Sequence, residues 1–86
     1  MVTLSFTKEG DSYVALYNGA GGGLEINCPS GTTVYVYGDI SGNGNYSLLY
    51  KEKCALFTGI LDMNGLTRVK IVCDCATAPT GYVNEN

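Results

Sequence analysis

The sequence predicts an all-β fold, a small antiparallel sandwich or barrel of about seven short strands with an extended C-terminal arm. Apolar and polar residues alternate with a period of two along most of the chain, which is typical of strands with one buried face. Clusters of glycine and asparagine separate the alternating runs, and no window has apolar residues at helical spacing. With 86 residues the chain fits one domain, because two would each be too small to bury a core. We place that domain at residues 1–75 and the arm at residues 76–86.

Four alternating runs predict the strands of the first half. Val14 and Leu16 are expected on the core face of the second strand, and Val34 and Val36 on the core face of the fourth. The Pro-Ser-Gly segment at residues 29–31 is expected to end the third strand. The four expected strands cover residues 2–7, 12–17, 24–28 and 32–38.

Turn signals organise the second half in the same way. An Asn-Gly pair within residues 41–45 predicts a hairpin, and residues 62–65 are expected to form another hairpin turn. The strand between these turns that is apolar on both faces is expected to be central. Beyond residue 75 the chain contains Pro79 and Gly81 and loses its periodicity, which indicates an extended or flexible arm. The expected strands cover about residues 46–51, 54–61 and 66–75.

Four cysteines, Cys28, Cys54, Cys73 and Cys75, admit three disulfide pairings or a four-thiolate zinc site. The single residue between Cys73 and Cys75 is shorter than the spacing of two to four residues in structural zinc sites. Each cysteine also lies among apolar or strand-forming residues. We therefore expect reduced thiols that fill the core, with a disulfide and a metal site as the alternatives.

The sequence lacks the residue sets of common catalytic sites. With no histidine, the Ser-His-Asp and Cys-His mechanisms and imidazole metal sites are excluded. Residues 39–44 match the first half of a calcium loop, but Tyr50 stands where the bidentate glutamate is needed, so a hairpin turn is expected. The glycine-rich residues 19–23 precede a strand rather than the helix of a phosphate-binding loop. We expect no enzymatic activity, no cofactor and no metal.

The seven tyrosines are the most informative feature for function. Tyrosine offers a large contact area at low entropic cost and retains a polar group, so it is enriched at interfaces. An aromatic face for binding is therefore predicted, and a second core layer is the alternative. The predicted interface residues lie opposite the expected core faces or in the arm: Tyr13, Tyr17, Tyr35, Tyr37 and Tyr82.

Charge and hydropathy bear on partners and location. The net charge is −3 and the sequence shows no cluster of Lys and Arg, so we expect no nucleic-acid binding. No apolar run is long enough for a membrane span, and the N-terminal residues do not have the profile of a secretory signal. The protein is expected to be made in the cytoplasm and to bind no membrane.

Residues 4–14, LSFTKEGDSYV, resemble the start of small β-rich virion proteins of tailed phages that infect gut Bacteroidales, including crAss-like phages. The strand Val34–Tyr37, its Gly/Asn-rich hairpin and Tyr46 are similar to the same proteins. The resemblance covers about the first half of the chain. It implies a capsid auxiliary or decoration subunit, or a head-fibre component, and no functional residues are carried over.

We therefore expect a structural virion protein that binds the major capsid protein or other virion proteins in many copies. It would attach through the tyrosine-bearing face and the terminal arm, and a homo-oligomer is compatible with this role. The alternative is a small carbohydrate- or receptor-binding β module, since flat tyrosine faces can stack on sugars.

Overall fold

The computed structural model of the protein describes residues 1–85, and the regular structure in them is entirely β. The strands form one antiparallel sheet with the order β1-β7-β4-β6-β3-β2, and β5 pairs with β4 outside this order. This arrangement confirms the all-β class that the alternation predicts. The strands are β1 (Val2–Thr3), β2 (Thr7–Glu9), β3 (Ser12–Tyr17), β4 (Gly21–Asp39), β5 (Tyr46–Asp62), β6 (Arg68–Asp74) and β7 (Thr80–Glu85).

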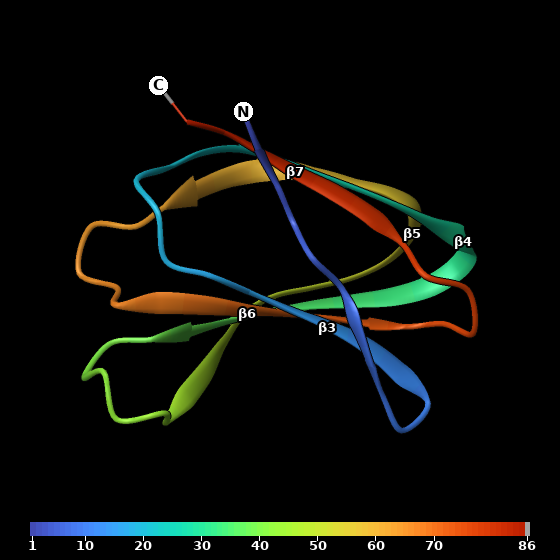
Figure 1. Cartoon of the computed structure of the whole chain (residues 1–86), viewed down its shortest axis with the longest axis horizontal. Helices are drawn as coiled ribbons and strands as arrows, with labels where there is room; N and C mark the ends of the chain where they lie inside the picture. The colour runs from blue at the N-terminus through green and yellow to red at the C-terminus, as the bar shows by residue number, and fades with distance from the viewer. Residues whose placement is uncertain (86) are drawn as a thin grey trace.

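Strand β4 is shared by two layers of the curled sheet. One of its edges pairs with β5, while its other edge pairs with β7 in the first half and with β6 in the second half. We call the layer with β1 and β7 the upper layer and the layer with β2, β3 and β6 the lower layer, as they lie in Figure 1. Each layer contains one half of β4 and one half of β5.

The bend between the two halves of β4 lies where the sequence predicts a strand end. The register of β4 against β5 shifts between Asn27 and Thr32, and Gly31 has a φ of 86°. The Thr32 hydroxyl donates a hydrogen bond to the Pro29 carbonyl over 2.6 Å, which holds the bend. The expected strands at residues 24–28 and 32–38 are therefore halves of one strand, because β5 follows β4 through the bend.

The core lies between the layers and is apolar. Val34 and Val36 have no exposed surface, as the alternation predicts. Of the two core residues predicted on β3, Val14 is buried, but Leu16 is 60% exposed and that part of the prediction is wrong. Tyr17, expected on the outer side, is 6% exposed because it pairs with buried Val69. The fully buried side chains are Ile26, Val34, Val36, Asp39, Val69, Ile71, Cys73 and Val83.

The expected C-terminal arm is a strand of the sheet, which corrects both the arm and the domain end at residue 75. Residues 80–85 form β7, which pairs with β1 and with β4, and Val83 is fully buried. Pro79 precedes this strand rather than ending the regular structure. Residue 86, the last residue of the expected arm, lies outside the described residues.

The end of β7 is fastened to β3 by a polar cluster. The Tyr17 hydroxyl donates a hydrogen bond to Glu85 Oε2, and the Ala20 N–H donates to the same oxygen over 2.8 Å. The Gly21 N–H donates to the Tyr17 hydroxyl oxygen over 2.8 Å. Burial and the hydrogen bond to Glu85 raise the pKa of Tyr17, and the hydrogen bonds from Tyr17 and Ala20 lower the pKa of Glu85.

The burial of β7 predicts that Val83→Ala lowers the free energy of unfolding by about 1–3 kcal/mol, as for other large-to-small changes in a packed core. The matched control is Asn84→Ala, which changes the neighbouring exposed side chain and should alter stability by less than about 0.5 kcal/mol. Urea denaturation measures both. Equal effects of the two variants would contradict the position of Val83 in the core.

The Tyr17–Glu85 contact predicts a particular pH dependence of stability. A carboxyl whose pKa is lower in the folded state stabilises the protein above its unfolded pKa and loses that contribution as the pH falls through the folded value. The melting temperature of Glu85→Gln should therefore fall less than that of the parent between neutral pH and about pH 3. Thermal unfolding followed by circular dichroism across this range tests it, and parallel pH curves would refute it.

Candidate functional site

The outer side of the lower layer carries tyrosines and lysines on neighbouring strands. Tyr35 of β4 pairs with Lys51 of β5, and Tyr37 pairs with Lys70 of β6. The rings of Tyr35 and Tyr37 are stacked, with centroids 6.1 Å apart and planes 15° from parallel. Lys51 Nζ lies 5.6 Å from the centroid of the Tyr35 ring, and Lys70 Nζ lies 5.4 Å from that of Tyr46. We call Tyr35, Tyr37, Tyr46, Lys51 and Lys70 the tyrosine–lysine face.

The fold gathers positive charge on this face. The chain has five basic residues, and besides Lys51 and Lys70 both Lys53 and Arg68 occupy outward positions of the same layer. Arg68 is partly neutralised by an ion pair with Asp39, and Asp74 lies beside Lys53 because both pair with Thr33. The face is therefore net positive, although the whole chain has a net charge of −3. Alternation explains the gathering, because residues two apart on a strand point to the same side.

Apolar side chains flank the tyrosine–lysine face. Leu48 pairs with Tyr37 and is 51% exposed, and Leu16 pairs with Lys70 and is 60% exposed. Val72 lies beside Tyr35 and is half-buried. The face thus combines aromatic rings, aliphatic side chains and cations on one side of the sheet.

The structure does not bring the five predicted interface tyrosines together. Tyr35 and Tyr37 share the tyrosine–lysine face, whereas Tyr17 is buried and cannot offer contact surface. Tyr13 is half-buried and pairs with Cys73, whose side chain is in the core. Tyr82 lies in the upper layer, where it pairs with Thr3 and Glu25.

The sequence reasoning missed Tyr46 and the lysines of the face. The available signal was the pair of patterns Lys51-x-Lys53 and Arg68-x-Lys70, because each places two cations on one side of a strand. The expectation that the chain has no cluster of basic residues considered only residues that are close in the sequence, whereas these basic residues come close through strand pairing. The sheet places these two patterns on opposite edges of β4.

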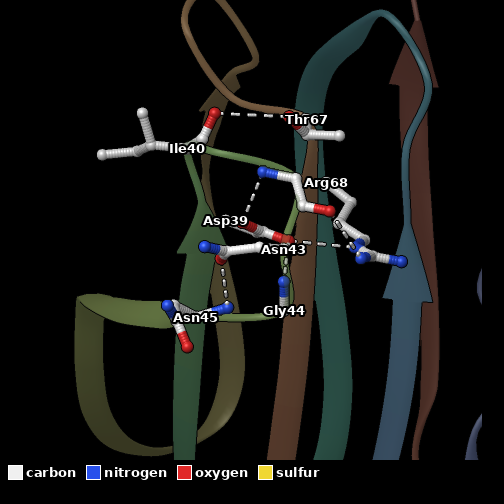
Figure 2. Close-up of polar contacts among 8 residues, drawn as sticks. Asp39, Ile40, Asn43, Gly44, Asn45, Thr67 and Arg68 are labelled. Carbon is white, nitrogen blue, oxygen red and sulfur yellow. Dashed lines mark hydrogen bonds and ion pairs between the residues drawn. The ribbon is translucent and has the colours of Figure 1, made fainter.

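The loop at residues 39–45 is held by its own backbone, as Figure 2 shows for Asp39 and Gly44. The Asp39 carboxylate accepts hydrogen bonds from the N–H groups of Gly42 and Gly44 over 2.9 and 3.0 Å. Arg68 Nε donates to the same carboxylate over 3.1 Å. These donors occupy the oxygens that a calcium ion would need, so the loop is a carboxylate-anchored hairpin turn.

The electrostatics of Asp39 follow from the same contacts. Burial raises the pKa of this carboxyl, but the hydrogen bonds from Gly44, Arg68 and Gly42 outweigh burial and leave the pKa below its ordinary value. Asp39 is therefore ionised and paired at neutral pH. Its backbone carbonyl also accepts a hydrogen bond from the Thr67 N–H over 2.7 Å, which connects the hairpin to the start of β6.

The four cysteines are free thiols at the end of the core beside the β4 bend. Cys73 is fully buried, and burial together with the other cysteines raises its pKa to about 12. The Cys28 thiol donates weakly to the Cys54 carbonyl over 3.5 Å. Within residues 1–85 the Cys, Asp and Glu side chains form no group of three or more that could hold a metal ion.

The burial of Cys73 predicts a low reactivity toward thiol reagents. With a pKa of about 12 against an ordinary 9.0, its thiolate fraction near pH 8 is about 1,000-fold lower than that of an unperturbed thiol. Mass spectrometry after alkylation with iodoacetamide should find Cys73 modified last in the folded protein. All four cysteines should react in guanidinium chloride, and early modification of Cys73 in the folded state would be the opposite result.

None of the residues that the structure describes belongs to a helix long and apolar enough to cross a membrane. Comparison of the chain with protein-family models, curated proteins and solved structures found no match.

Proposed function

We propose that the chain is a structural subunit of a phage particle, a capsid auxiliary or decoration protein that attaches through the tyrosine–lysine face. The observation that carries this proposal is the face itself, in which Tyr35, Tyr37 and two lysines are half-exposed or exposed on one side of a sheet. The resemblance of the first half of the chain to phage virion proteins supports the particle as its place. The contacts support adhesion rather than catalysis.

The composition of the face indicates the chemistry of its partner. The stacked Tyr35 and Tyr37 rings present a rigid aromatic area, and such rings lose little entropy when they are covered. The lysines beside them favour an acidic protein surface and orient the partner through complementary charge. A particle subunit with an acidic patch on its shell surface fits both properties.

This function predicts that purified particles of the source phage contain the chain in many copies. Binding to particles that lack the chain should weaken about thirtyfold or more in Tyr37→Ala, the effect of truncating a central aromatic contact.

Lys70→Glu should weaken binding most at low salt, because screening reduces the contribution of the charge at high salt. Sedimentation of the labelled protein with particles measures each effect.

The matched controls carry the same changes outside the face. Tyr82→Ala removes a tyrosine from the upper layer, and Lys8→Glu reverses an exposed charge on β2. Both should bind particles like the parent protein. Absence of the chain from particles would refute the proposal, and so would preferential binding of single-stranded DNA by the parent, since lysines and aromatic rings also suit that ligand.

A further inference from the structure

A separate hollow lies on the outer side of the upper layer. It has a volume of about 440 Å³, within the range of small-molecule sites. Its walls come from three neighbouring strands, with Glu25 of β4 placed between Thr58 of β5 and Tyr82 of β7. Gly23 and Asn84 continue the same side of the sheet, and they pair with each other.

Gly23 distinguishes this hollow from an accidental depression. Its neighbours Gly21 and Gly22 have positive φ angles of 84° and 136°, and a Cβ at either would collide with backbone atoms. Gly23 has no such backbone requirement, and the nearest atom to a Cβ built there is Asn84 Cβ at 4.0 Å. A glycine within a strand weakens the strand, and it often marks a place where a ligand or another backbone approaches closely. The missing side chain at Gly23 keeps the hollow open.

The polar groups around the hollow indicate the class of ligand. Glu25 supplies acceptors, the Asn84 amide supplies donors and an acceptor, and the Thr58 hydroxyl supplies both. Sugar hydroxyls need this mixture, because each of them donates and accepts hydrogen bonds. Glu25 is the one charged side chain among the described lining residues, and Met1, which carries the N-terminal ammonium, lines the hollow as well. Charges of both signs therefore lie at the hollow, which favours a ligand without net charge, and a simple cation would leave the donors unused. Tyr82 adds a half-exposed aromatic ring on which the apolar face of a sugar can stack.

We propose that this hollow is a binding site for a neutral saccharide, with the sugar ring against Tyr82 and Gly23 and its hydroxyls on Glu25 and Asn84. The site lies in the other layer from the tyrosine–lysine face and is independent of attachment to a particle. A subunit held by its lower layer would present the hollow of its upper layer outward.

The test is titration of the isotopically labelled full chain with neutral methyl glycosides, followed by amide chemical shifts. Glycosides of glucose, galactose, mannose and N-acetylglucosamine would be used up to about 50 mM, above the millimolar Kd expected of a small open site. At least one should shift the amides of residues 23–25, 58–59 and 82–84 in a saturable manner. Gly23→Val should weaken binding about tenfold or more by filling the hollow.

The Gly23→Val variant is suited to this purpose because Gly23 needs no positive φ and valine favours strands, so the variant should fold. Tyr82→Leu should also weaken binding about tenfold, whereas Tyr37→Leu, the matched change on the other layer, should leave binding unchanged. The absence of saturable shifts with every glycoside would overturn the proposal. Glycoside binding that is unchanged in Gly23→Val would overturn it too. A lysine-rich peptide is titrated as a competing ligand, and chemical shift changes at the hollow with this peptide but with no glycoside would also overturn the proposal.

Discussion

The fold depends on the pairing of one long strand with three partners. β4 is bonded along one edge to β5 and along the other to β7 and then β6, so neither layer forms without it. The bend at residues 28–31 turns the second half of β4 under the first without breaking its pairing with β5. Since Leu24 and Ile26 point inward before the bend and Val34 and Val36 point inward after it, one strand lines both sides of the core.

Two polar contacts fasten the ends of strands β4 and β7 to neighbouring elements. Asp39 ends β4 and binds both the hairpin backbone and Arg68, so it joins the hairpin to the start of β6. Glu85 ends β7 and accepts hydrogen bonds from the Tyr17 hydroxyl and from the Ala20 N–H in the loop after β3. Both carboxylates accept hydrogen bonds in the charged form, and these bonds lower their pKa values. Acid would therefore weaken the Glu85–Tyr17 contact between the two layers and the Asp39–Arg68 contact within the lower layer.

Alternation predicted the fold class, because strands with one buried face leave a period of two that turns and loops do not share. It also assigned Val34 and Val36 to the core, since their strand has tyrosines on the other side. It failed for Leu16 and Tyr17 of β3, where the aromatic side chain is buried and the aliphatic one is exposed. Tyr17 is inside because it pairs with buried Val69, and Glu85, 68 residues away, accepts a hydrogen bond from its hydroxyl, so no local pattern records either partner. β7 was missed for a similar reason. Its short run has no clear periodicity, and its pairing partners β1 and β4 are far from it in the sequence.

The candidate sites show why local pattern carries less information about function than about fold. The outward position of Tyr35 was predictable from β4 alone. Its neighbours were not, because Lys51, whose amine lies over the ring, belongs to β5, and Val72, which pairs with Tyr35 on the other edge, belongs to β6. The two outer faces differ in charge although they share β4, because Glu25 lies before the bend and the lysines that pair with Tyr35 and Tyr37 lie beside the half after it. The bend at residues 28–31 places the two halves of β4 in different layers, so a single strand contributes to a cationic aromatic face and to a hollow that contains Glu25. A chain of this length can therefore present two outer surfaces of different charge and composition within a single domain.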